Sequence, residues 1–287
     1  MKIDRRKFLE FILFMSLPFS KIFSKSNEKE KVVLIRDKNL LNKSKKINKE
    51  VLKEMIIKGI CLLKGEEKIE IALKNFFEKD EILGIKSNEW GPLPTAPEVE
   101  EILKELLIKI GIKEENIGIA DRNVLRMKIF KNCTSLINVR PMRTHHWAGV
   151  GSLIKNYIMF VEKPSDYHSN FCSKLGSIWH KPIVKDKTRI NILIMFTPLF
   201  YGIGAHHFDK KYTFEYCGIL FGEKPATVDA VGLKILKEMR NKYFKKDLPF
   251  QPPPIHIQIA DKIYNLGKTN LNEIEIIKSN PMSDDLI

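Results

Sequence analysis

The sequence predicts an α/β protein: one large domain with a mostly parallel sheet that carries helices on both faces. Two observations predict this class. Short apolar, β-branched runs alternate along the chain with longer segments whose apolar residues recur every three to four positions. The 287 residues are 44% hydrophobic, which is enough for one large core, and no repeat of solenoid period is present. Strands separated by helices pair in parallel, so the helices must cover both faces of the sheet.

The first elements follow from local patterns. The β-branched segment 31–36 predicts a strand. Segments 48–63 and 67–77 carry apolar residues at helical spacing, so they predict two amphipathic helices. The apolar segment 82–86 predicts the next strand, and the Asn-Glu-Trp-Gly-Pro turn that follows ends it.

The next helix has a sequence signature at each end. Thr95 and Glu98 are spaced as a capping box, in which the hydroxyl accepts from the Glu98 amide while the carboxylate reaches back. Gly111 is expected to end this helix. Segment 117–121 then predicts another strand.

The second half of the chain continues the alternation. Segments 136–139 and 190–195 predict buried strands. Pro225 suits the first turn of a long helix that runs to residue 246. Three prolines at 252–254 predict a stiff extended segment, and 273–277 predicts an edge strand.

The N-terminus resembles a targeting signal. Residues 1–24 join a basic start to an apolar run shorter than the ~20 residues that span a bilayer. Arg5 and Arg6, followed by Lys-Phe-Leu, resemble the twin-arginine motif. The resemblance implies export of a folded protein by the twin-arginine machinery, to the periplasm or to a tether on the outer face of the cytoplasmic membrane. The alternatives are an ordinary signal peptide or an uncleaved tether. Residues 25–30 form a polar linker, and 31–287 form the α/β domain.

The net charge of +14 would suit nucleic acid or an acidic membrane. The distribution of this charge, however, argues against nucleic-acid binding. Lysine supplies most of the charge and is scattered, whereas base recognition favours arginine on a concentrated basic face. The four cysteines form no Cys-x-x-Cys pair, so the chain has no iron–sulfur motif, and we expect the cysteines to be buried.

A basic segment follows the strand at 136–139. Arg140, Arg143 and Lys155 flank Gly149-Val-Gly-Ser152, which we expect to enter a helix. Backbone amides at a helix start, together with nearby cations, bind anions, so the segment predicts an anion site. The alternative is a solvated basic loop.

The histidines offer proton-transfer groups or metal ligands. His145 and His168 are the candidates, although a metal needs three or four converging ligands. Adjacent residues on a strand point to opposite faces, so His145 and His146 should diverge. The alternative is that these histidines are polar loop residues without a catalytic or metal-binding role.

Three further polar residues stand near element ends: Asn88 after a strand, Asp121 at the end of another, and Asp229 inside the helix that starts at Pro225. Asp121 is a candidate acid–base residue, or it caps the following helix. No nucleophile elbow, P-loop or dinucleotide fingerprint is present.

With these residues identified, the chain resembles the DUF362 family, a domain family of unknown function. The matching segments, in the family's order, are 85–88, 95–98, 118–121, 136–145, 154–156 and 225–232. The resemblance implies an α/β fold and, in many relatives, an attached ferredoxin-like iron–sulfur module, which a redox partner would have to supply here. Arg143 stands where relatives carry Lys, and Lys224 and Phe196 stand where they carry acidic residues.

These observations lead to two functional hypotheses. The first is an exported redox- or cofactor-associated enzyme, its cofactor unknown, that binds an anionic small molecule. Its catalytic candidates are His145, His168 and Asp121. The ligand-binding candidates are Lys86, Asn88, Arg140, Arg143, Lys155, Asn156 and Asp229. The second is a non-catalytic exported binding or assembly protein that uses the same site. Both require these side chains to meet at the carboxyl edge of the sheet.

Overall fold

A computed structural model describes residues 28–202, 204, 208–280, 282, 286 and 287. The expected signal at 1–24 and His206 and His207 lie outside the described residues. The strands are Glu30–Arg36 (β1), Leu83–Lys86 (β2), Ile117–Ala120 (β3), Ser135–His145 (β4), Gly149–Gly151 (β5), Thr188–Leu199 (β6), Gly218–Gly222 (β7) and Ile274–Ser279 (β8). The helices are Lys49–Lys64 (α2), Ile69–Lys74 (α3), Pro97–Lys109 (α4), Lys128–Asn132 (α5), Leu153–Asn156 (α6), Ser169–Cys172 (α7), Pro225–Phe244 (α8) and Ile255–Lys262 (α9).

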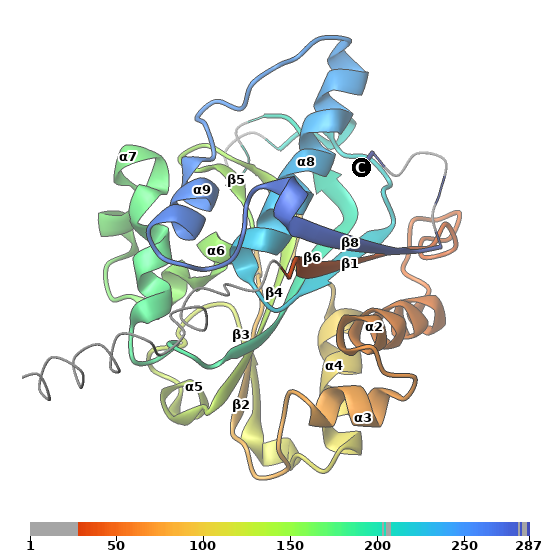
Figure 1. The fold of residues 1–287 in the computed structure, drawn as a ribbon, viewed down its shortest axis with the longest axis vertical. Coiled ribbons are helices and arrows are strands. Elements are labelled where there is room, and N and C mark those ends of the chain that lie inside the picture. Colours follow the sequence, from red (N-terminus) through yellow and green to blue (C-terminus); the bar gives the residue numbers. More distant parts are fainter. Residues whose placement is uncertain (1–27, 203, 205–207, 281, 283–285) are drawn as a thin grey trace, which may run out of the picture.

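All eight strands belong to one mixed sheet in the order β3-β2-β4-β6-β7-β1-β8, with β5 paired to β4 (Figure 1). The pairs β3–β2, β2–β4, β4–β6 and β1–β8 are parallel. The pairs β6–β7, β7–β1 and β4–β5 are antiparallel. The predicted class, a mostly parallel sheet in one large α/β domain, is confirmed.

Helices α2, α3 and α4 lie together on one face of the sheet (Figure 1). Alternate strand residues such as Ile85, Val139 and Ile192 point into this layer, where they are fully buried. Asn48 begins α2 by accepting from the Val51 amide, and Gly65 ends it in a left-handed conformation. This layer is apolar, so the polar side chains of the same strands must face the other side.

Helices α5, α6, α8 and α9 cover the opposite face (Figure 1). Leu136 and Leu193 are buried there, and the alternation places Lys86, Asn138 and Arg140 on the same side. Because β3, β2 and β4 are parallel neighbours, their carboxyl ends meet at one edge. That edge, on the α6 side, is where the polar residues gather.

Several local expectations need correction. Thr95 does not cap α4: its hydroxyl accepts from the Asn88 amide, and α4 begins after Ala96 without a side-chain cap. The segment 149–151 forms a hairpin strand with β4, so only the four residues of α6 follow as helix. Strand β7 and helix α9 were not predicted, because each is short and lacks a distinctive periodic pattern. The predicted edge strand is confirmed as β8, which pairs with β1.

Within the described ranges, no helix combines the length and the apolar character needed to cross a bilayer.

Candidate functional site

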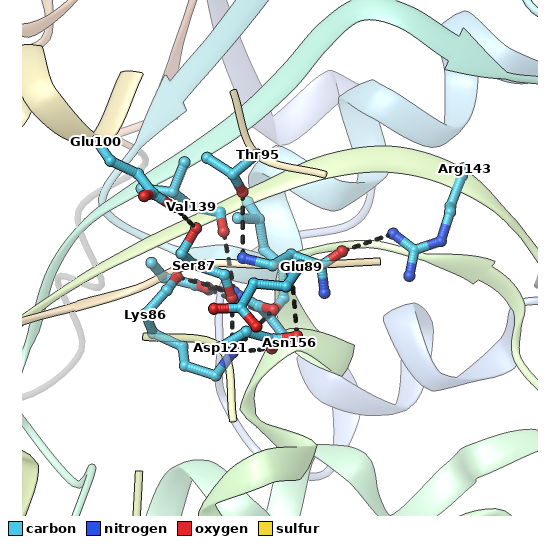
Figure 2. A network of polar contacts seen from close by, with 12 residues as sticks. Lys86, Ser87, Glu89, Thr95, Glu100, Asp121, Val139, Arg143 and Asn156 are labelled. Atoms are coloured by element: carbon cyan, nitrogen blue, oxygen red, sulfur yellow. Dashed lines mark hydrogen bonds and ion pairs between the residues drawn. The ribbon is translucent and has the colours of Figure 1, made fainter. Parts of the chain in front are cut away.

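A buried ion pair joins the ends of β2 and β3. Lys86, the last residue of β2, pairs laterally with Ala120 and Asn138 on the neighbouring strands. Its Nζ lies 2.6 Å from Oδ1 of Asp121 and 2.6 Å from the Ser87 carbonyl oxygen (Figure 2). Burial lowers the pKa of Lys86 to about 8, although Asp121 opposes the shift. Burial also raises the pKa of Asp121, but Lys86 and a hydrogen bond from the Glu89 amide bring it below its usual value. The pair is therefore ionised at neutral pH.

Buried asparagines fix α6 against the strand ends. The Asn156 side-chain amide donates to the backbone oxygens of Lys86 and Val139 and to Oδ1 of Asn138, all at 2.9–3.0 Å (Figure 2). The Asn138 amide in turn donates to the Leu153 oxygen and to Oδ1 of a buried asparagine on β6. Asn156 lines the site, and its amide hydrogens are used to position α6.

The loop after β2 carries a partner for Arg143. Nη1 of Arg143 donates to Oδ1 of Asn88 at 2.9 Å. The Arg143 guanidinium lies 4.3 Å from the centre of the Trp90 ring. The loop is held because Thr95 and Asn88 exchange hydrogen bonds and the Ser87 hydroxyl donates to Glu100. Burial lowers the pKa of Arg143 well below its usual value, with Arg140 contributing. Arginine nevertheless stays charged in proteins.

Two more cations are buried without a carboxylate partner. Arg140 is 4% exposed, and within the described ranges its guanidinium makes no ion pair or hydrogen bond. Lys155 is 3% exposed, and its Nζ has one polar contact there, the Cys172 sulfur at 3.9 Å. Burial lowers the pKa of Arg140 to about 10 and that of Lys155 to about 8. Both values lie above neutral pH, so positive charge accumulates here.

The histidines beside these cations are neutral. Burial, Lys155 and Arg140 hold the pKa of His145 far below its usual value, and burial with Lys155 lowers that of His168 to about 4. Nδ1 of His145 accepts from the Trp147 amide at 3.2 Å. The expectation that His145 and His146 diverge is wrong: β4 ends at His145, and the two rings stack at 4.6 Å.

These groups surround one cavity of about 280 Å³ at the predicted sheet edge. Its lining contains eight of the ten predicted residues: Asn88, Asp121, Arg140, Arg143, His145, Lys155, Asn156 and His168. Lys86 lies directly behind Asp121. The juxtaposition is as expected from the strand ends, while the chemical roles of these residues remain predictions.

Asp229 belongs to the structure of α6, outside this lining. Its carboxylate accepts from the Ser152 hydroxyl at 2.6 Å and from the Leu153 and Ile154 amides at 2.9 and 3.0 Å. Burial raises its pKa to about 6. The amides expected to bind an external anion are thus already used by this side chain. The ligand role of Asp229 stays a prediction, and any anion bound near the start of α6 would be held by the side chains of Arg140, Arg143 and Lys155 instead of by these two amides.

The described residues include no group of three histidine, cysteine, aspartate or glutamate side chains placed to hold a metal. All four cysteines are buried and free, as expected. Lys224 and Phe196, which stand where acidic residues were expected, do not line the cavity. Phe196 packs in the apolar layer on the other face of the sheet.

Several members of the site were not predicted. Trp90, which faces Arg143, and Arg122, which also lines the cavity, follow strand ends directly, and that position could have indicated them. Cys172 and His256 gave no local signal, because they reach Lys155 only through tertiary packing. A larger open groove of about 1350 Å³ adjoins the cavity and shares Met159 and Pro164 with it.

Comparisons with protein-family models, curated proteins and solved structures returned no match to this chain.

Proposed function

We propose that the cavity at the carboxyl edge of β2, β3 and β4 binds a small anionic metabolite. One observation carries the proposal: among the described residues, the buried cations in the lining form no ion pair with a carboxylate. Arg140, Arg143 and Lys155 are each at most 4% exposed. Asp121 is the single carboxylate among the described lining residues, and Lys86 already neutralises it.

The energetics support a ligand. Removing a charge from water costs several kcal/mol unless an opposite charge or strong hydrogen bonds replace the lost solvation. Arg140 forms no hydrogen bond or ion pair with a described residue and feels Asp121 and Asp229 only at longer range, and Lys155 contacts a thiol. Burial raises the pKa of Cys172, so the sulfur stays neutral and does not serve as the counter-ion. An anion in the cavity would supply the missing charge.

Size and donor geometry narrow the ligand class. A cavity of about 280 Å³ lies at the lower end of small-molecule sites, so the buried part of the ligand is small. Guanidinium groups suit carboxylate or phosphate oxygens because their donors form a planar fork. Any larger portion of the ligand would extend into the adjoining groove past Met159.

From the sequence we further propose that the chain is an exported, DUF362-like protein. In this proposal it is a redox- or cofactor-associated enzyme that depends on a partner for any iron–sulfur chemistry. His145 and His168 line the same cavity and stay the proton-transfer candidates of this proposal, although their lowered pKa values make both rings weak bases.

One observation favours the second candidate, a non-catalytic binding protein. The Asp121 carboxylate in the lining is ion-paired with Lys86 at 2.6 Å, and the lowered pKa values of His145 and His168 make both rings weak bases, so strong acid–base groups are lacking among the described lining residues. The two candidates share the anion site and differ in whether the bound molecule is transformed.

Thermal denaturation of the full chain with phosphate, oxalate and lactate tests anion binding. At a ligand concentration a hundred times Kd, binding adds about 2.7 kcal/mol to the free energy of unfolding. Arg143→Gln should reduce this stabilisation by removing a donor. Lys185→Gln, which removes an exposed charge outside the lining, is the matched control and should retain it. Equal stabilisation of both variants, or none of the wild type, would contradict the proposal.

A further inference from the structure

We propose that Lys155 is a nucleophile that forms an imine with the carbonyl carbon of a 2-oxo acid held in the cavity by Arg140 and Arg143. The inference rests on the proposed anion site and names its ligand class.

The two buried lysines of the site differ in their partners. Lys86 is held by Asp121 and by the Ser87 carbonyl oxygen, both at 2.6 Å, and it lies behind the lining. Lys155 reaches the cavity itself, and among the described residues it meets no carboxylate. Lys86 is thus fixed as a structural cation, whereas the Lys155 amine is free to meet a ligand.

Burial is the main reason that the protonated form of Lys155 is disfavoured, and Arg140 and Arg143 add to it, while Cys172 opposes the shift. Arg140, Arg143 and a neutral His145 face it from β4, and His168 and Cys172 approach from the segment around α7. From α9, the buried His256 is also within electrostatic range. With a pKa of about 8, Lys155 is a neutral amine far more often at neutral pH than an exposed lysine.

Arg140 and Arg143 are sufficient to bind the carboxylate of the ligand, so Lys155 is not needed for that purpose. A 2-oxo acid presents a carboxylate, which a guanidinium fork binds, and an electrophilic carbonyl on the adjacent carbon. Holding the carboxylate at Arg140 and Arg143 brings that carbonyl to the remaining wall of a cavity of about 280 Å³, which Lys155 helps to form. Binding and reaction thus fall to different side chains.

The step balances without an oxidant or reductant. The Lys155 nitrogen attacks the carbonyl carbon and a carbinolamine forms; the carbon–oxygen bond then breaks, and the oxygen leaves as water with the two amine hydrogens. His168, which lines the same cavity and keeps the higher pKa of the two histidines, is placed to carry protons between nitrogen and oxygen.

Reductive trapping of the full chain tests the inference. The protein is incubated with pyruvate or 2-oxoglutarate and sodium cyanoborohydride, and the adduct is located by peptide mass mapping. We expect one adduct per chain, with Lys155 labelled at least about tenfold more than the exposed lysines, because its neutral fraction is larger. Lys86, whose pKa is also about 8, should stay unlabelled because it is paired with Asp121 and does not line the cavity. Lys155→Arg keeps the charge and should abolish this adduct. Adduct spread evenly over the lysines, or none at Lys155, would overturn the inference.

Lactate separates this inference from the anion site on which it depends. It carries the same carboxylate without the carbonyl, so it should stabilise the protein and protect Lys155 from trapping. Stabilisation by lactate without any adduct from pyruvate refutes the imine and leaves the anion site intact. Absence of both effects refutes the anion site as well. Mapping of the wild-type protein keeps the test decisive if Lys155→Arg fails to fold.

Discussion

Two buried arginines show how one residue type serves opposite purposes in this protein. Arg240 on α8 donates to the backbone oxygens of Leu248, Phe200 and Pro249 at 3.0, 3.0 and 2.7 Å. Arg140 is as buried but makes no hydrogen bond to a described residue. Arg240 therefore stabilises the fold, whereas the burial of Arg140 has a cost that no hydrogen bond from a described residue offsets.

Replacement by methionine should separate these two roles. Without ligand, Arg140→Met should raise the free energy of unfolding by about 1 to 3 kcal/mol, because an unpaired buried charge is removed. The matched variant Arg240→Met should lower it by about 2 kcal/mol or more, since three carbonyl oxygens lose their donor. Urea denaturation measures both. Destabilisation of equal size in the two variants would show that Arg140 is also a structural residue.

The histidine and lysine positions of the site were predictable as a group but not individually. Strand ends indicated Lys86, Asp121 and His145, because a strand that stops at a polar residue places it at the sheet edge. Nothing local indicated that Lys86 pairs with Asp121, 35 positions away, while Lys155 pairs with no described carboxylate. Partner choice depends on distances that only the folded chain defines.

At the scale of elements, α8 ends in a conformation that its sequence does not favour. Lys245 follows the last helical residue with a φ of 55°, in the left-handed region. Glycine is preferred there because a Cβ atom crowds the backbone. The side chain is exposed, so its packing contribution is small.

Lys245→Gly should therefore raise the free energy of unfolding by about 1 kcal/mol. Lys242, in the last turn of the same helix, provides the comparison. Lys242→Gly should lower the free energy by about 1 kcal/mol, because glycine is unfavourable inside a helix. Opposite signs in urea denaturation are the expected outcome. Loss of stability in Lys245→Gly would mean that its side chain makes compensating contacts.

The short elements near the site depend on their neighbours. Helix α6 has four residues, too few for stability alone, and it forms because Asp229 from α8 accepts from its first amides. Around α7, the three consecutive residues 170–172 have φ of 50°, 53° and 63°. This left-handed turn presents the Cys172 sulfur to Lys155. The sequence predicted a helix after Ser152 but not that α6 has only four residues, and α7 was not predicted because it carries no strong sequence pattern.

For the whole molecule, the buried histidines predict sensitivity to acid. Burial lowers the pKa of His256 to about 3, and burial with nearby cations lowers those of His145 and His168. The folded state therefore resists protonation, while the unfolded chain takes up protons as the pH falls below about 6.5. Stability present at pH 7 is lost in that range. Asp229, whose pKa burial raises to about 6, opposes the loss by taking up one proton when folded.

Between pH 7 and pH 5, the fully buried His256 should contribute a loss of about 2 kcal/mol, His145 a similar loss, and Asp229 a gain of about 1 kcal/mol. We expect a net fall of about 3 kcal/mol in the free energy of unfolding, measured by urea denaturation at constant ionic strength. His256→Leu should reduce the fall by about 2 kcal/mol, since one titrating group is removed. A free energy that is unchanged over this range would contradict the burial of these rings.

The sequence by itself determined the fold class and the edge at which the polar residues meet. Both follow from local patterns. Apolar residues that recur every two positions indicate strands, those that recur every 3.6 positions indicate helices, and the carboxyl ends of parallel strands lie at the same edge of the sheet. Tertiary structure alone decided which charges have partners. In the folded chain, Asp121 forms an ion pair with Lys86, and Asp229 accepts hydrogen bonds from the first amides of α6. Arg140 and Lys155 form no ion pair with a carboxylate among the described residues. The electrostatic free energy of a charged side chain depends on its burial and on its distance from other charges across the fold. A local sequence pattern determines neither quantity.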